Sequence, residues 1–181
     1  MKSTSLIFVL LFTLIIAGCS SNNETNETTA DQTQEQISTE ASTSQLASDA
    51  FVFEAYDTKG ALHQSTEYVG RQPVVINFWG TWCPPCRQEI PELVKLYDEY
   101  SPRGIEMVSL AVRDEPEKVI SFANEHDMNW KMWMGSNDLA YKYDIKGVPT
   151  TIFLDSNGNE LFRFIGAQNY NTFKEAFEAI L

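Results

Sequence analysis

Cysteine and histidine are both scarce in this chain, which has three cysteines and two histidines in 181 residues. Cys83 and Cys86 stand three positions apart, a spacing that half of a tetrahedral zinc site would also use. The other ligands would have to come from Cys19, His63 and His126, and none of these has a partner at the spacing of a second ligand pair. The shortage therefore disfavours a zinc site, and we expect neither a metal nor a cofactor.

Positive charge is also in short supply. The chain has 13 Lys and Arg against 25 Asp and Glu, a formal net charge of −12 at pH 7, which disfavours nucleic acid as a partner. Residues 20–50 contain no Lys, Arg, aromatic residue, Gly or Pro, and are rich in Ser, Thr, Asn, Gln and Glu. Such a segment has too little apolar surface to offset the entropy of folding. We therefore predict that residues 19–50 are a disordered acidic linker.

No apolar run in the sequence reaches the ~20 residues that a membrane-spanning helix needs. The apolar residues 6–16 follow Lys2 and are themselves followed by the sequence AGC at residues 17–19. This pattern is typical of a short signal-peptide core and its small-residue cleavage site. The ending resembles a bacterial lipoprotein box, which implies a signal peptide over residues 1–18 and lipid, including palmitate, on Cys19. The mature protein would then be anchored to the extracytoplasmic face of the bacterial cell membrane. An ordinary signal peptide that leaves an unpaired cysteine, or an uncleaved anchor, is the alternative.

The remaining residues, 51–181, have an ordinary length for one domain with its own core. Alternation of strand and helix patterns predicts an α/β fold with a right-handed crossover and a parallel core, and we expect a monomer. The apolar patterns and turn signals predict strands at 74–79, 105–112, 130–134, 151–154 and 160–165, helices at 84–100, 114–126, 138–143 and 171–180, and an N-terminal β-hairpin from 51–56 and 61–64.

The strand predicted at 74–79 leads directly into the two closely spaced cysteines. Residues three apart are neighbours on a helical turn, so the two sulfurs can form and reopen a small disulfide ring. Cys83 would start the helix, where unpaired backbone N–H groups and the helix dipole favour a thiolate, which makes it the attacking sulfur and Cys86 the resolving one. Pro84 and Pro85 fit the first helical turn and stiffen the ring. A permanent structural disulfide is the alternative, but so short a loop removes little entropy from the unfolded chain.

The sequence NFWGTWCPPC at residues 77–86, followed by Glu89 and Pro91, resembles the thioredoxin-like proteins of the TlpA/ResA group. These are membrane-tethered extracytoplasmic thiol-disulfide oxidoreductases. The sequence GVPTT at residues 147–151 resembles the cis-proline loop of the same family. Together the two motifs imply a thioredoxin-like fold over residues 51–181, with a central mixed β-sheet flanked by helices and a cis bond before Pro149.

The resemblance also implies a role for Glu89, because the TlpA/ResA group has a glutamate at this place in its motif. Glu89 lies three residues beyond Cys86 on the same predicted helix, where its carboxylate can face the sulfur and assist its deprotonation. The alternative is a solvated helix residue. The chain departs from thioredoxin at Asn77, where thioredoxin has a buried aspartate, and Asn77 cannot titrate.

Substrate binding is expected on both sides of the reactive sulfur. Trp82 is expected to form an exposed apolar rim, next to Pro84 and Pro85. By resemblance, a cis Pro149 turns the backbone of Val148 outward to pair with an extended substrate segment.

By family resemblance, Cys83 would attack a disulfide in a protein substrate and Cys86 would release the reduced product. No His lies between the cysteines, which favours a reductant, with exported proteins such as apocytochrome c as substrates and cytochrome c biogenesis as a plausible setting. A membrane thiol donor of the CcdA/DsbD type would recharge the pair. Two alternatives remain open: a peroxiredoxin-like thiol peroxidase, and a non-enzymatic metal-carrying lipoprotein, whose Sco-type examples space their cysteines one residue further apart.

Overall fold

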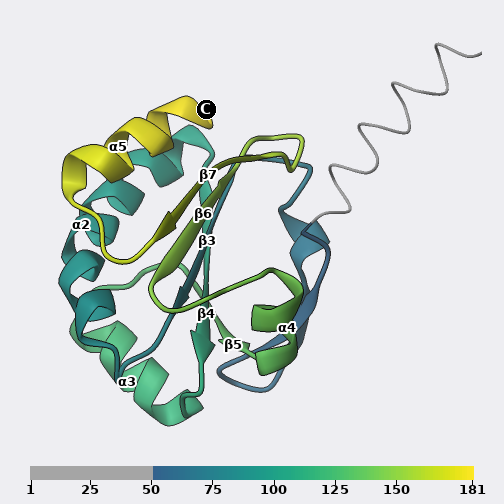
Figure 1. Cartoon of the computed structure of the whole chain (residues 1–181), viewed down its shortest axis with the longest axis vertical. Helices are drawn as coiled ribbons and strands as arrows, with labels where there is room; N and C mark the ends of the chain where they lie inside the picture. The colour runs from purple at the N-terminus through teal and green to yellow at the C-terminus, as the bar shows by residue number, and fades with distance from the viewer. Residues whose placement is uncertain (1–50) are drawn as a thin grey trace, which may run out of the picture. The chain divides into compact units, whose positions relative to one another are not determined.

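The computed structural model describes residues 51–181, so the predicted signal peptide, the predicted lipidation of Cys19 and the predicted linker lie outside the described residues. Seven strands form a single mixed sheet with the order β2-β1-β5-β4-β3-β6-β7 (Figure 1). Strands β3, β4 and β5 run parallel, whereas β6 pairs antiparallel with β3, and β1 pairs antiparallel with β5. The predicted α/β fold with a mixed sheet is therefore confirmed. The strands are β1 (Glu54–Asp57), β2 (Leu62–Gln64), β3 (Val74–Trp79), β4 (Glu106–Val112), β5 (Lys131–Gly135), β6 (Thr150–Leu154) and β7 (Glu160–Ile165).

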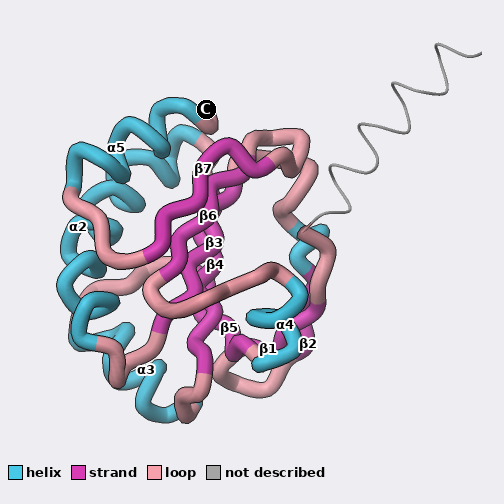
Figure 2. Tube along the Cα trace, in the orientation of Figure 1, coloured by secondary structure: helices cyan, strands magenta, loops and turns pink. Residues whose placement is uncertain are grey.

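Helices cover both faces of the sheet. Three helices lie together on one face, α2 (Pro84–Tyr100), α3 (Pro116–Glu125) and α5 (Tyr170–Ala179), and the short α4 (Asn137–Lys142) lies on the other face (Figure 2). Two 3-10 turns, η1 (Ser65–Glu67) and η2 (Ser101–Arg103), complete the elements of the described residues. No helix within residues 51–181 is long and apolar enough to cross a membrane.

The central strand β3 is buried over its whole length because both of its faces are covered. Val75 and Trp79 pack into the core beneath α2, α3 and α5, whereas Ile76 and Phe78 point into the second core on the face of α4. This alternation follows from the two-residue period of a strand. Each fully buried apolar side chain of this size contributes roughly 1.5–3 kcal/mol to folding, so β3 is firmly held at the place where it delivers the cysteines.

The ends of two predicted elements differ from the structure. The strand expected from residue 51 begins at Glu54, because the backbone N–H of Phe53 donates instead to Ser65 Oγ. The helix expected from residue 114 begins at Pro116, because a proline disfavours a helical conformation of the residue before it and Glu115 is extended. Strand β1 pairs antiparallel with β2.

Candidate active site

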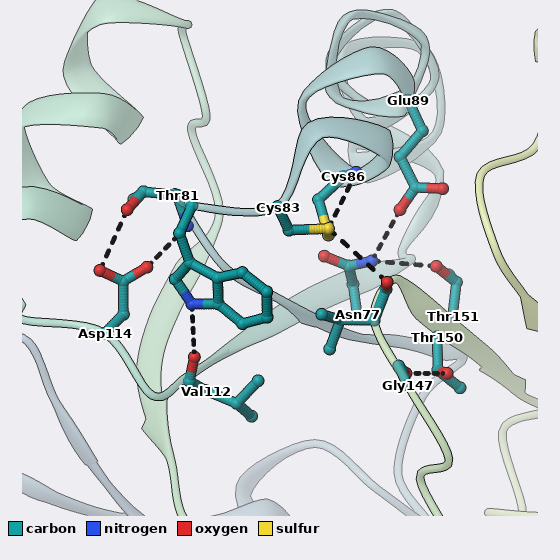
Figure 3. The surroundings of a disulfide bond; sticks show 12 residues. Asn77, Thr81, Cys83, Cys86, Glu89, Val112, Asp114, Gly147, Thr150 and Thr151 are labelled. Atoms are coloured by element: carbon teal, nitrogen blue, oxygen red, sulfur yellow. Dashed lines mark hydrogen bonds between the residues drawn. A yellow bond between two sulfur atoms is a disulfide. The ribbon is translucent and has the colours of Figure 1, made fainter.

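The two cysteines lie at the start of α2, just after the loop that connects it to β3. A three-residue loop follows Trp79, Cys83 is the N-cap of α2, and Pro84 and Pro85 occupy its first positions, where a missing N–H removes no helical hydrogen bond. Cys83 and Cys86 form a disulfide with their Cα atoms 5.3 Å apart, and the backbone N–H of Cys86 donates to Cys83 Sγ at 3.2 Å (Figure 3). That N–H is one of the unpaired donors of the first turn, so it favours negative charge on the sulfur of Cys83 once the disulfide is reduced.

The predicted rim residue Trp82 is 47% exposed beside the disulfide, whereas only 2% of Cys83 is exposed. Access to the attacking sulfur is therefore governed by the residues that surround it. Trp82 is fixed by a hydrogen bond from its Nε1 to the carbonyl of Val112 at 3.1 Å, and the guanidinium of Arg113 lies 4.9 Å from the centre of its ring. A Cβ atom at Gly80 would lie 2.6 Å from Trp82 Nε1, so glycine at this position lets the indole take its place.

Asp114 is a site residue that the sequence reasoning missed, since it was interpreted only as part of a helix start. Its carboxylate accepts from the backbone N–H of Thr81 at 2.6 Å and from Thr81 Oγ1 at 3.0 Å (Figure 3). The two segments meet because β3 and β4 are parallel neighbours, with Trp79 opposite Ala111, so the loops after them leave the sheet at the same edge. An acidic residue two positions after the end of a buried parallel strand was the available signal.

The predicted cis-proline loop lies on the other side of the disulfide. The Val148–Pro149 peptide bond is cis, and the carbonyl oxygen of Val148 lies 3.6 Å from Cys83 Sγ. The antiparallel pairing of β3 with β6, in which Phe78 is opposite Thr150, brings this loop to the cysteines across 65 residues of sequence. Pro149 itself is buried and Val148 is partly exposed, so the backbone of Val148 is the part of this loop that borders the sulfur.

Glu89 is buried on α2, one helical turn after Cys86, with 1% of its surface exposed. The alternative of a solvated helix residue is therefore wrong. Burial raises the pKa of Glu89 to about 8, while the backbone N–H of Gln168 and the side-chain amide of Asn77 oppose part of the rise. Among residues 51–181 the hydrogen bonds of its carboxylate do not include either sulfur. Oε1 accepts from Asn77 Nδ2 at 3.1 Å, and Oε2 makes no hydrogen bond of normal geometry, although the backbone N–H of Gln168 approaches the carboxylate.

Asn77 joins Glu89 to a buried polar group beneath the cysteines (Figure 3). Its Nδ2 also donates to Thr151 Oγ1 at 2.9 Å, and its Oδ1 accepts from Ser109 Oγ at 3.3 Å. Trp130 Nε1 in turn donates to Ser109 Oγ at 2.7 Å. Ser109 and Thr151 were not identified from the sequence, and Trp130 was interpreted as scaffold, because nothing in their local patterns distinguishes them from other core positions.

The two histidines lie away from the disulfide in separate environments. His63 stacks on Trp133 and lies within hydrogen-bonding distance of Asp57 and Glu67, at 3.4 and 3.3 Å. His126 stacks on Phe122 on the surface of α3. In the part of the chain that the structure describes, no three His, Cys, Asp or Glu side chains are grouped so that they could hold a metal ion.

A dithiol at the N-terminus of a helix, delivered by a central strand and facing a cis-proline loop, defines a thioredoxin-like thiol-disulfide oxidoreductase. The chain belongs to the AhpC/TSA family, whose model matches residues 46–159. It is 31% identical over 143 residues to the thiol-disulfide oxidoreductase ResA of Geobacillus thermodenitrificans, which covers 78% of this chain and 82% of that protein.

Two solved structures have the same fold. A thiol:disulfide interchange protein of the thioredoxin family from Chlorobium tepidum has a TM-score of 0.64 at 25% identity, covering 71% of this chain and 92% of that one. A secreted disulfide oxidoreductase of Mycobacterium tuberculosis has a TM-score of 0.65 at 21% identity, covering 72% and 98% of the two chains. The enzyme class inferred from the cysteine motif is thus confirmed.

Proposed function

We propose that this oxidoreductase works outside the cytoplasm as a reductant of disulfides in exported proteins, apocytochrome c among them. The observation that carries the proposal is the surroundings of Cys83, where the exposed Trp82 lies on one side and the backbone carbonyl of Val148 on the other. An apolar side chain beside a stretch of backbone suits an extended protein segment that contains a disulfide.

In the proposed reaction the enzyme begins as a dithiol. The thiolate of Cys83 attacks one sulfur of the substrate disulfide, forming a mixed disulfide and releasing the other substrate sulfur as a thiolate. The thiolate of Cys86 then attacks Cys83 Sγ, which breaks the mixed disulfide and releases the second substrate sulfur. The substrate gains two electrons and the enzyme is left with the Cys83–Cys86 disulfide, the state seen in the structure.

Glu89 has the role of proton acceptor for Cys86 in this scheme. Its pKa of about 8 lies close to the ordinary value for a thiol, so a proton can pass between the two groups at little cost in free energy. The carboxyl is one helical turn from Cys86, and its unpartnered Oε2 is able to take the proton directly or through a water molecule.

Substrate would bind along the edge formed by Trp82, Pro84, Pro85 and Val148. Trp82 offers apolar contact area, Pro84 is exposed at the helix start, and the backbone of Val148 offers hydrogen bonds to an extended strand. Pro149 supports this role by removing an N–H group at the turn.

A lipid on Cys19 would hold the enzyme on the extracytoplasmic face of the membrane, and a membrane thiol donor of the CcdA/DsbD type would return the disulfide to the dithiol. The lipoprotein-like sequence before Cys19 supports the anchor. The secreted Mycobacterium tuberculosis protein of the same fold is consistent with a site of action outside the cytoplasm. We propose a monomer as the working form.

The test is to incubate the reduced protein with insulin and follow the loss of insulin disulfides, with the variants Cys83→Ser and Cys86→Ser as a matched pair. We expect the wild type to reduce insulin, Cys86→Ser to accumulate a covalent mixed disulfide, and Cys83→Ser to do neither. A reduction potential close to the ≈ −120 mV of a strong oxidant would contradict the proposed direction. Consumption of hydrogen peroxide without reduction of insulin would instead identify a thiol peroxidase.

A further inference from the structure

Asn77 links Glu89 to the sheet by hydrogen bonds. It projects from the central strand β3, is 1% exposed, and contacts groups from three other elements: Glu89 on α2, Ser109 on β4 and Thr151 on β6. A buried amide with this many partners is restrained by them, since moving it away would leave polar groups unpaired.

The hydrogen bonds of this group connect Trp130 to Glu89. The indole N–H of Trp130 can only donate, so Ser109 Oγ accepts it at 2.7 Å. Ser109 Oγ donates in turn to Asn77 Oδ1 at 3.3 Å. The two hydrogens of Asn77 Nδ2 then point at Thr151 and at Glu89.

In this arrangement Glu89 faces an N–H donor of Asn77. Such a donor stabilises the carboxylate more than the protonated acid. It also occupies Oε1, so a proton on Glu89 belongs on Oε2, the oxygen without a partner among residues 51–181. The amide, together with the backbone N–H of Gln168, thus makes the carboxyl easier to ionise, and it leaves Oε2 as the favoured oxygen for the proton.

We propose that Asn77, held in place by Ser109 and Trp130, is the positioning residue that orients the Glu89 carboxyl and favours its ionised form beside the redox pair. This inference rests on the proposed function, in which Glu89 accepts the proton of Cys86. Asn77 does not touch either sulfur by any hydrogen bond of the described residues, so it acts through Glu89 and not on the substrate.

The groups around Glu89 allow its titration to be measured without interference. Cys86 lies one turn away on the same helix, Asn77 contacts Glu89 from β3, and the backbone of Gln168 approaches it from the segment before α5. No charged side chain contributes to the raised pKa of Glu89. In the oxidised protein the two sulfurs do not titrate, so the protonation of Glu89 can be followed there without interference from the thiols.

The experiment is a pH titration of the oxidised full-length protein, in which the carboxyl carbon of Glu89 is followed by ¹³C NMR. We expect a midpoint near pH 8 in the wild type. Asn77→Ala removes a hydrogen bond to the carboxylate and should raise the midpoint by roughly one to two pH units. Ser109→Ala releases Oδ1 of Asn77 and should raise it in the same direction by less.

Thr151→Val is the matched control, because it removes a buried partner of Asn77 but leaves the donor to Glu89 in place. We expect its midpoint to stay within about 0.3 pH units of the wild type, whereas a purely structural disturbance would move all three variants together. An unchanged midpoint in Asn77→Ala, or an equal shift in Thr151→Val, overturns the proposal. Circular dichroism of each variant establishes that it is folded.

A second measurement separates this inference from the proposed function. The rate of insulin reduction by each reduced variant is measured across the same pH range, and we expect the profile of Asn77→Ala to shift upward with the titration of Glu89. If the titration shifts and the rate profile does not, the positioning of Glu89 stands and the proposed role of Glu89 in exchange is wrong.

Discussion

Replacement of Glu89 by glutamine should remove a loss of stability that the oxidised wild type suffers as the pH rises. An acid whose pKa is raised by folding binds its proton more tightly in the native state than in the unfolded state. For Glu89 the pKa rises from 4.5 in the unfolded chain to about 8 in the fold. Between these values the native state holds a proton that the unfolded state has lost, so stability falls as the pH rises.

The size of the effect follows from the width of that interval. Each pH unit costs about 1.4 kcal/mol of unfolding free energy, so the wild type should lose about 3 kcal/mol between pH 4.5 and pH 7, and about 5 kcal/mol in total by pH 8. Above pH 8 both states are ionised and the loss stops growing. The glutamine of the variant carries no titratable proton, and every other ionisable group is the same in the two proteins, so the loss should be absent from Glu89→Gln.

The assay is urea unfolding of the oxidised wild type and Glu89→Gln at intervals from pH 4.5 to pH 9, with the difference in unfolding free energy plotted against pH. Glutamine places an amide where Oε2 has no partner, which adds a constant offset that does not depend on pH. The slope of the difference is therefore the informative quantity. A difference that stays flat across this range refutes the claim that Glu89 is protonated in the fold at neutral pH.

Two further predictions concern the loop that presents Trp82. Gly80→Ala should displace the indole, because the new Cβ would lie 2.6 Å from its Nε1, and the rate of insulin reduction should fall at least several-fold while alkylation of the reduced thiols by iodoacetamide keeps its rate. If iodoacetamide alkylation slowed as much as insulin reduction, Trp82 would not act on protein substrates alone. Asp114→Ala removes both hydrogen bonds to Thr81 and should lower the unfolding free energy, measured in urea, by about 1–3 kcal/mol. The control is Glu115→Ala at an exposed neighbouring position, which should change the unfolding free energy by less than about 0.5 kcal/mol. Similar values for the two variants would show that the hydrogen bonds of Asp114 do not stabilise the fold.

The strand and helix around the cysteines could be predicted closely from the sequence. The predicted strand at 74–79 and helix at 84–100 agree with β3 and α2, because an unbroken β-branched run and a 3.6-residue apolar period are local signals. The helix-start signature at residues 114–117 agrees with α3, which begins at Pro116, but the hydrogen bonds of the Asp114 side chain to Thr81, 33 residues earlier, were not predicted. Local sequence preferences carry no information about contacts between residues so far apart in the chain.

The sequence by itself determined the redox pair, its place at a helix start and the class of enzyme, since all three depend on residues within one short stretch. Tertiary structure alone decided that Glu89 is buried, that Asn77 donates to its Oε1, and that the carbonyl of Val148 borders Cys83. The hydrogen bonds of Asn77 to Ser109 and Thr151 join positions 32 and 74 residues apart. The register of β3 with β4 and β6 decides which side chains lie next to Asn77, and this register exists only once the sheet has formed.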